Sequence, residues 1–439
     1  MKEKCGLFGI YSKKPYKNCI KEVINGLNLL QHRGQEGCGI SYNISGIPIV
    51  KKGIGLVKDV FNEYSTNNYT NMCIGHVRYS TSGEKNKYGD TQPLYGKTNI
   101  GDFYLAHNGN IPNIEGHDTK YLISFLENNT YDNWNERLIN LIETIPCAYC
   151  LLILTDTEIY IIRDRFGIRP LCLGYYNDDF CISSESSALH KFNHLRDVSP
   201  GEICKLSNNG LERVYLSKRS KLCICAFEFI YFLKPNSFTD GYIVEDVRKN
   251  LGITLAKKED LLLDPSFKVV GIPNSGIISA KSYSEFLKLD YKQFITKNKN
   301  VNRTFILSTN EERQKACKEK FIFSKNISGY KIIVIDDTIV RGNVMTSIVH
   351  KLWEMGAIEI HIRIPAPPVI SKCQFGIDIP NEQELLVTNR NNEQIKNLLN
   401  VTSIRYLNCK DLDNIIPKDS YKECFSGEMN NDITLLPFY

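Results

Sequence analysis

The sequence has no run of the ~20 consecutive apolar residues that a membrane-spanning helix needs. It also has little net charge, because 54 basic and 49 acidic residues leave only +5. Basic runs typical of nucleic-acid or membrane-surface binding are missing. The apolar stretch near the first residue is too short for a secretory signal peptide. We therefore expect a cytoplasmic protein that binds neither nucleic acid nor a membrane.

The 15 cysteines are spread over 439 residues and are not crowded as in small disulfide-framed domains. In a reducing compartment, most should be buried free thiols. A few remain candidates for catalysis or metal binding, and only their positions can identify them.

The length predicts two or three domains, and the two halves of the chain differ in pattern. The first half has short strand-like runs at 5–11, 72–77, 104–107, 149–154 and 158–163, with one amphipathic helix near 20–30. The second half alternates helices with buried strands at 269–272, 331–335, 359–364 and 384–387. This alternation is typical of a parallel sheet with crossover helices. We place the boundary between residues 220 and 221.

Cys5 begins the first predicted strand. If the four residues before it are removed, its free α-amine, with an unperturbed pKa near ~8, can act as general base beside the thiol. A cysteine at such a place, taken alone, is more often a small buried residue.

Three polar segments around other strands favour a catalytic Cys5 over a merely buried one. They are 31–37 (QHRGQEG), 75–81 (GHVRYST) and 106–110 (AHNGN). Arg78 can hold the α-carboxylate of an amino acid through paired hydrogen bonds, and Asp118 can hold its α-ammonium group. The Asn108 side chain and the Gly109 N–H can face the oxyanion formed when a thiolate attacks a carboxamide.

These segments, with 5–9 (CGLFG), 164–171 (DRFGIRPL), 183–186 (SSES) and 198–202 (VSPGE), resemble the class II glutaminase domain of the N-terminal-nucleophile hydrolases. The resemblance implies a four-layer αββα sandwich over residues 5–220 and removal of residues 1–4 as a leader. It implies catalytic roles for Cys5, Asn108 and Gly109. It also implies glutamine binding by Arg33, Gly34, Arg78 and Asp118. The family's Ser-Ser-Asp-Thr-Glu is replaced here by residues 116–120 (GHDTK).

In the second half, a β-branched strand at 332–335 runs into Asp336, Asp337 and a short loop, and a helix follows. Two carboxylates at a strand tip can take ribose hydroxyls and Mg²⁺. The loop N–H groups and the helix N-terminus can hold a phosphate. A bare acid pair is more often a solvated turn, so the argument depends on the longer string.

That string, 336–342 (DDTIVRG), resembles the signature of the type I phosphoribosyltransferases, which implies a parallel-sheet domain over 221–439. The resemblance implies that phosphoribosyl pyrophosphate is bound by Lys297, Arg303, Asp336, Asp337, Thr338, Arg341 and Gly342. It also implies that magnesium is bound by Ser275, Asp336 and Asp337. Several positions depart from the family: Asn300 and Asn302 in the expected mobile loop, and Asn343 and Val344 where hydroxyl residues are usual.

The two motif sets in this order resemble the glutamine-dependent amidophosphoribosyltransferase family. One branch of that family carries a leader peptide and a [4Fe–4S] cluster on four cysteines. Cys225, Cys373 and Cys424 match three of them, and Tyr421 stands where the fourth is expected. Three thiolates are fewer than the usual four. Two alternatives stay open: a cluster with a substitute ligand such as Cys223 or Cys409, or relic cysteines buried as small apolar residues.

Together the two resemblances predict a glutamine-dependent phosphoribosyltransferase that makes 5-phosphoribosylamine, glutamate and pyrophosphate. Its substrates would be glutamine and phosphoribosyl pyrophosphate, purine nucleotides are candidate feedback inhibitors, and a homo-oligomer is expected. The alternative is a degenerate homologue that binds phosphoribosyl pyrophosphate or a nucleotide without turnover, because of the changes at Asn300, Asn343, Val344 and Tyr421. A steady-state assay for glutamate and pyrophosphate separates the two.

Overall fold

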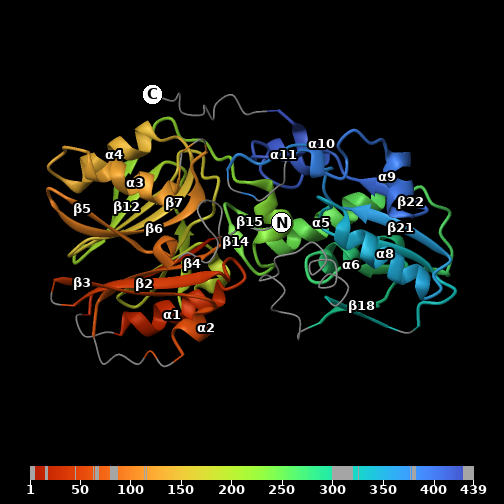
Figure 1. Cartoon of the computed structure of the whole chain (residues 1–439), viewed down its shortest axis with the longest axis horizontal. Helices are drawn as coiled ribbons and strands as arrows, with labels where there is room; N and C mark the ends of the chain where they lie inside the picture. Colours follow the sequence, from red (N-terminus) through yellow and green to blue (C-terminus); the bar gives the residue numbers. More distant parts are fainter. Residues whose placement is uncertain are drawn as a thin grey trace.

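Two antiparallel sheets packed face to face make up the first half of the chain in this computed structural model (Figure 1). The structure describes residues 5–14, 18–44, 46–62, 64, 69–79, 88–112, 114, 116–298, 320–324, 326–375, 377 and 382–428. One sheet has the order β11-β9-β10-β1-β4-β2-β3 and the other β13-β12-β8-β7-β6-β5. The first contains β1 (Gly6–Ser12), β2 (Gly37–Ile44), β3 (Ile47–Ile54), β4 (Met72–Arg78), β9 (Cys172–Tyr176), β10 (Asp179–Ser183) and β11 (Asn193–Asp197). The second contains β5 (Leu94–Thr98), β6 (Gly101–Asn110), β7 (Ala148–Leu154), β8 (Ile159–Arg163), β12 (Glu202–Ser207) and β13 (Gly210–Leu216).

Helices cover the outer face of each sheet and complete four layers (Figure 1). Helices α1 (Cys19–Leu29) and α2 (Val57–Val60) lie on the first sheet, and α3 (Asp118–Glu127) and α4 (Trp134–Thr144) on the second. Alternate residues of β1 face opposite sides, so Leu7 packs between the sheets and Phe8 packs under α1. The predicted αββα sandwich is confirmed.

Helix α1 shows why the sequence folds this way locally. Asn18 caps its N-terminus by accepting a hydrogen bond from the Lys21 N–H. Ile20, Val23 and Leu27 recur at helical spacing and are fully buried against the sheet. The buried stripe fixes the helix on β1 and β4, the two strands that hold Cys5 and Arg78 in place.

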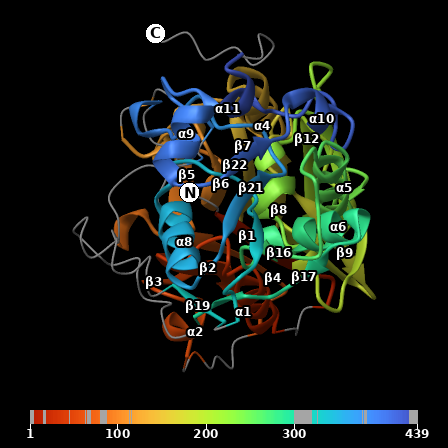
Figure 2. The same cartoon turned by 90° about the vertical axis from the view of Figure 1, so that its right-hand side faces the viewer.

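A parallel five-stranded sheet with the order β17-β16-β20-β21-β22 forms the centre of the second half. Its strands are β16 (Phe267–Gly271), β17 (Asp290–Tyr291), β20 (Lys331–Ile335), β21 (Glu359–Ile364) and β22 (Ser403–Tyr406). Helices α5 (Val244–Lys257) and α6 (Gly276–Leu287) lie to one side of this sheet and α8 (Asn343–Glu354) to the other (Figure 2). This is the predicted type I phosphoribosyltransferase architecture.

Shorter elements surround these sheets. The strands β14 (Phe238–Thr239) and β15 (Tyr242–Ile243) form one hairpin, and β18 (Ile295–Lys297) pairs with β19 (Phe321–Phe323). Among the described residues, the remaining helices are α9 (Asn392–Leu399), α10 (Cys409–Asp413) and α11 (Glu423–Ser426). Single turns are η1 (Tyr88–Asp90), η2 (Ser186–Ala188), η3 (Glu228–Phe232, a π-helical turn) and η6 (Glu382–Glu384).

The strand predicted at 384–387 is wrong. The chain there forms η6 and a turn, and the fifth strand of the sheet is β22. Leu385 and Leu386 are buried, but the Leu386 N–H donates to the Val340 carbonyl at 2.8 Å instead of joining a strand ladder. A short apolar run does not distinguish a buried strand from an apolar turn that covers a loop.

No helix in the described part of the chain is long and apolar enough to cross a membrane. None of the 14 cysteines that the structure describes is in a disulfide, and 12 of them are buried. Disulfides therefore do not hold together the described segments, and apolar packing between helices and sheets does.

Candidate active sites

Cys5 directly precedes β1, and its side chain is 8% exposed. The thiol donates a 3.5 Å hydrogen bond to the Tyr79 carbonyl. Strand β1 pairs with β4 so that Gly6 is opposite Val77, and this register brings Cys5 beside the end of β4. The thiol therefore faces a pocket instead of the apolar core.

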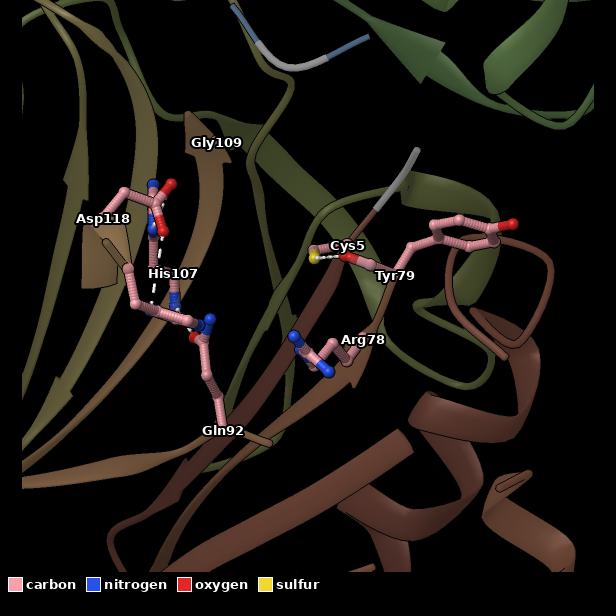
Figure 3. A pocket seen from close by; sticks show the side chains of 8 residues that line it. Cys5, Arg78, Tyr79, Gln92, His107, Gly109 and Asp118 are labelled. Atoms are coloured by element: carbon pink, nitrogen blue, oxygen red, sulfur yellow. Dashed lines mark hydrogen bonds and ion pairs between the residues drawn. The ribbon is translucent and has the colours of Figure 1, made fainter. Parts of the chain in front are cut away.

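That pocket gathers residues that are far apart in the sequence (Figure 3). Figure 3 shows Cys5 and Arg78 on one side of it and His107 and Asp118 on the other. Of the residues predicted from the sequence, Cys5, Arg78, Gly109 and Asp118 line it together. The full lining is Cys5, Arg78, Tyr79, Gln92, His107, Gly109, His117 and Asp118.

Asn108 and Gly109 lie near the end of β6, where an oxyanion would need hydrogen-bond donors. A Cβ atom on Gly109 would lie 2.1 Å from the Ala148 carbonyl oxygen, so only glycine fits there. Asn108 is 2% exposed, and its side-chain nitrogen has no hydrogen-bond partner among the described residues. A buried donor without a partner is unusual in a folded protein and is a candidate donor to a ligand.

Four lining residues were missed by the sequence analysis: Tyr79, Gln92, His107 and His117. The Gln92 side chain accepts a 2.6 Å hydrogen bond from the His107 N–H and donates a 3.0 Å bond to Thr119. His117 Nδ1 lies 3.7 Å from Asp118 Oδ1, and burial lowers the pKa of His117 although Asp118 opposes the shift. The sequence signal that could have identified His117 was its position directly before Asp118.

The departure at Lys120 is explained by a carboxylate on η1. Lys120 Nζ lies 2.9 Å from Asp90 Oδ1, and Arg78 Nη2 lies 3.9 Å from Asp90 Oδ2. Burial alone would raise the pKa of Asp90, but its hydrogen bond to Lys120 and nearby positive charges lower it. Asp90 therefore stays ionised and supports both cations at the edge of the pocket.

Arg33 and Gly34 do not line this pocket. Arg33 lies behind Cys5, where its Nε donates a 2.9 Å hydrogen bond to the Cys5 carbonyl. A Cβ atom on Gly34 would lie 2.6 Å from the Val77 carbonyl carbon, so glycine permits the close approach of the turn after α1 to β4. Both residues shape the pocket from outside.

The acid pair follows β20, as predicted. The Asp337 N–H donates a 2.9 Å hydrogen bond to Asp336 Oδ1, and the Thr338 hydroxyl donates a 2.8 Å bond to Asp337 Oδ2. Burial, and then the charge of Asp337, raise the pKa of Asp336 well above its usual value. Two crowded carboxylates of this kind attract a cation.

The loop after β16 reaches the same place. The Ser275 hydroxyl donates a hydrogen bond to Asp337 Oδ1. A Cβ atom on Gly276 would lie 2.5 Å from the Ile335 carbonyl oxygen, so glycine is needed where α6 begins against the end of β20. The predicted magnesium residues Ser275, Asp336 and Asp337 are therefore adjacent.

The predicted phosphate loop lies between the acid pair and α8. Gly342 is the N-terminal cap of α8 and has a φ of 84°, a conformation that favours glycine. Arg341 is exposed and forms a 2.8 Å ion pair with Glu384. Lys297 is exposed at the end of β18, and Arg303 lies outside the described residues.

Cys225, Cys373 and Cys424 come together as the resemblance predicted, and Tyr421 joins them. Cys225 forms a β-bridge with Tyr421, and the charges of Cys373 and Cys225 raise the pKa of both Tyr421 and Cys424, after burial as the main cause. In the residues that the structure describes, however, no three His, Cys, Asp or Glu side chains converge in a metal-binding arrangement.

Comparison with known proteins finds a matching family model and full-length relatives. The family model described as "Glutamine amidotransferase domain" matches residues 76–191. The amidophosphoribosyltransferase of Methanothermobacter thermautotrophicus is 35% identical over 433 residues, which cover 94% of this chain and 90% of the relative. The amidophosphoribosyltransferase of Bacillus subtilis is 32% identical over 468 residues, covering 100% of this chain and 97% of the relative.

A solved structure is similar over nearly the whole length. It is the glutamine phosphoribosylpyrophosphate amidotransferase from B. subtilis complexed with ADP and GMP, with a TM-score of 0.87 and 31% identity. The similarity covers 98% of this chain and 99% of that one.

Proposed function

The chain belongs to the amidophosphoribosyltransferase family, and we propose that its two sites divide the reaction of that family between residues 5–220 and residues 221–439. The enzyme transfers ammonia from glutamine to phosphoribosyl pyrophosphate, the first step of purine biosynthesis. The observation that carries the assignment of residues is the pocket in which Cys5, Arg78, Gly109 and Asp118 meet.

In the first site, the Cys5 thiolate attacks the glutamine carboxamide carbon. The free α-amine of Cys5, exposed by removal of residues 1–4, takes the thiol proton and later delivers it to the leaving ammonia. The Asn108 amide and the Gly109 N–H hold the oxyanion. Water then cleaves the thioester and releases glutamate.

Arg78 and Asp118 orient the substrate for this attack. Arg78 binds the α-carboxylate of glutamine, and Asp118 binds its α-ammonium group. The support is their common place in the pocket with Cys5, to which His117 adds a further polar surface. Arg33 and Gly34 act on glutamine indirectly, because they set the positions of Cys5 and β4.

In the second site, Asp336 and Asp337 bind the ribose hydroxyls, and the backbone from Thr338 to Gly342 binds the 5′-phosphate at the N-terminus of α8. Arg341 lies on that same loop. Lys297 and Arg303 bind the pyrophosphate. Ammonia attacks C1 of the sugar, and pyrophosphate leaves with the bonding electrons.

Magnesium fits this site, since two crowded carboxylates and the Ser275 hydroxyl form an all-oxygen donor set. We propose that Ser275, Asp336 and Asp337 hold it. When bound, Mg²⁺ neutralises the charge of the pyrophosphate leaving group.

An iron–sulfur cluster does not fit the side chains as they lie. The Tyr421 hydroxyl stands where a fourth thiolate is expected and donates a hydrogen bond to Glu423. Among the described residues, no three His, Cys, Asp or Glu side chains converge as metal ligands. Three cysteines and an engaged phenol are a poor ligand set for a cluster that usually takes four thiolates. We therefore derive no role for iron.

Nucleotide regulation and self-association are two further proposals for this chain. The B. subtilis enzyme was solved with ADP and GMP, and we propose that this chain also binds purine nucleotides as feedback inhibitors and forms a homo-oligomer.

The decisive experiment is a steady-state assay for glutamate and pyrophosphate, made on protein whose N-terminal residue has been identified by mass spectrometry. Equal amounts of both products, formed when both substrates and Mg²⁺ are present, support the complete transferase. Binding of phosphoribosyl pyrophosphate without either product would support the degenerate homologue.

A further inference from the structure

A buried cluster of four charged side chains lies behind Cys5, where the two halves of the chain meet. It consists of Arg33, Arg169, Glu185 and Glu228, which are 0–4% exposed. Two cations and two anions balance, as buried charges must. Three of the four come from the first half, and Glu228, on the turn η3, comes from the second.

Every nitrogen of the Arg33 guanidinium has a partner. Nε donates to the Cys5 carbonyl at 2.9 Å, and Nη1 donates to Glu185 Oε1 at 2.7 Å and to Glu228 Oε2 at 3.2 Å. Nη2 donates to Glu228 Oε1 at 3.0 Å. Because the guanidinium is planar and rigid, its fork on Glu228 fixes the direction in which Nε points at Cys5.

Glu228 is itself held rigidly. The Leu233 N–H donates to the Glu228 carbonyl at 2.9 Å and closes the π-helical turn. Arg248 bonds the carbonyls of Phe229 and Leu233 at 2.9 and 2.8 Å, and Arg169 adds a 3.2 Å bond to Glu228 Oε1. The carboxylate therefore reaches Arg33 from a turn whose backbone cannot shift freely.

We propose that Glu228 is a positioning residue for the nucleophile, acting through Arg33, so that the glutaminase site is incomplete without a carboxylate from the phosphoribosyltransferase half. The proposal rests on the role of Cys5 as nucleophile. Cys5 precedes the first strand and carries the reacting thiol, so its backbone must be held from outside that strand. Arg33 supplies that hold at its carbonyl, next to the atoms that react.

The test is Glu228→Gln in the full-length, N-terminally processed enzyme, and it follows glutamine hydrolysis, ammonia-dependent synthesis and alkylation of Cys5. Glutamine keeps the shape of the side chain but removes the charge that orients Arg33. We expect kcat for glutamine hydrolysis to fall about tenfold or more, since misplacement of a reacting group is costly. KM for glutamine should change less than about threefold, because Arg78 and Asp118 are untouched.

Two further readouts separate positioning from a general structural role. Ammonia-dependent synthesis should stay within about twofold of the unaltered enzyme, because the second site does not use the thiol. A diazoketone analogue of glutamine should alkylate Cys5 about tenfold more slowly. Glu228→Asp, which keeps the charge, should recover part of kcat.

Glu259→Gln is the matched control. The Glu259 side chain is 1% exposed and accepts the same kind of paired hydrogen bonds from Arg363, with lengths of 2.6 and 2.9 Å. Glu259 belongs to the second half of the chain and is not part of the cluster behind Cys5. Glu259→Gln should therefore leave glutamine hydrolysis unchanged. Equal loss of kcat in the two variants would overturn the proposal, as would an unchanged kcat in Glu228→Gln.

If Glu228→Gln does not fold, Arg33→Lys decides, since lysine keeps the charge but cannot bind Glu228 and the Cys5 carbonyl in one plane. An unchanged kcat in Arg33→Lys would overturn the proposal. Loss of glutamine use in Cys5→Ser, together with an unchanged kcat for glutamine hydrolysis in Glu228→Gln, would support the proposed function and contradict only the role of Glu228.

Discussion

Ser275 and Asp337 are 62 positions apart in the sequence, yet the Ser275 hydroxyl donates a 2.5 Å hydrogen bond to Asp337 Oδ1. The contact joins the loop after β16 to the acid pair after β20, two neighbouring strands of the parallel sheet. Because parallel strands bring their carboxyl ends to one edge, the two loops form a single site.

This geometry predicts how the acid pair contributes. Asp336→Asn and Asp337→Asn should each lower synthesis from both glutamine and ammonia by about a hundredfold, since both routes end at the sugar site. Glutamine hydrolysis measured alone should fall much less. Full synthesis by the double variant would exclude this site. Ser275→Ala should raise the Mg²⁺ concentration needed for half-maximal rate.

Cys5→Ser should abolish glutamine use and leave ammonia-dependent synthesis, because only the first site needs the thiol. Intact-mass measurement of active enzyme should show Cys5 as the first residue. Fully active protein that retains Met1 would contradict the role of the α-amine as base. Cys38→Ser is the control, since that thiol is buried and lies outside the pocket lining.

His117 predicts a pH dependence of glutamine binding. The charged groups around it are Asp118, Asp90, Arg78 and Lys120, and burial, as the main effect, lowers its pKa from the usual histidine value. His117 is therefore neutral at neutral pH and gains a charge only in the acid range. That charge would compete with the α-ammonium group for Asp118, so KM for glutamine should rise in acid.

The variant that checks this is His117→Asn, in which the acid rise of KM should disappear while kcat keeps the pH profile of the thiol and amine. Measurement of KM and kcat between about pH 5 and about pH 8, a range of about three decades of proton activity that covers histidine titration, distinguishes the two effects. A KM profile that is the same in both proteins would show that His117 does not act on the substrate.

For the cysteine group, we expect anaerobically purified protein to lack the absorbance near ~400 nm and the about four irons per chain of a thiolate-held cluster. Tyr421→Cys, which supplies a fourth thiol, should gain both after reconstitution with iron and sulfide. Iron that is present in the unaltered protein and lost in Cys225→Ser, Cys373→Ser and Cys424→Ser would contradict this prediction. It would show that the three cysteines hold a cluster.

Glu259 predicts a loss of stability in acid. Burial opposes its ionisation, but Arg363, with Tyr283, lowers its pKa to about 2. A carboxylate whose pKa is lower in the folded than in the unfolded state stabilises the fold above the unfolded value of about 4.3 and loses that effect as the pH falls towards 2.

The measurement is urea unfolding of the unaltered protein and Glu259→Gln. The variant should lose about 3 kcal/mol of unfolding free energy near neutral pH, as for a broken buried ion pair. The gap between the two proteins should narrow below pH of about 4.3. A gap that does not depend on pH would show that the pKa of Glu259 is not lowered.

The sequence predicted most elements because their signals are local. The apolar spacing of Ile20, Val23 and Leu27 defines α1. The β-branched run at 332–335 indicates β20, whose predicted bounds of 331–335 are those observed. The strand prediction failed at 384–387, where apolar residues pack as a turn over the phosphate loop. Such a run looks the same in the sequence whether or not a partner strand lies beside it.

The residues of each site were also predictable from the sequence where they belong to contiguous motifs. Cys5, Arg78, Gly109 and Asp118 all belong to such motifs and meet in one pocket. His117 was visible in the sequence as a departure from the family, but its place on the pocket wall was not. The direction of a side chain depends on the register of the strands and on what packs behind it.

By itself, then, the sequence determined the order of elements, the family and the chemical groups available, because hydrogen-bonding pattern, apolar period and turn residues act over a few neighbouring positions. Only the tertiary structure decided which charges balance each other. The Arg33 guanidinium spans 28 positions to the Cys5 carbonyl and 195 to Glu228. Buried charges have to find partners wherever the fold places them, so a pairing of this kind leaves no local pattern in the chain.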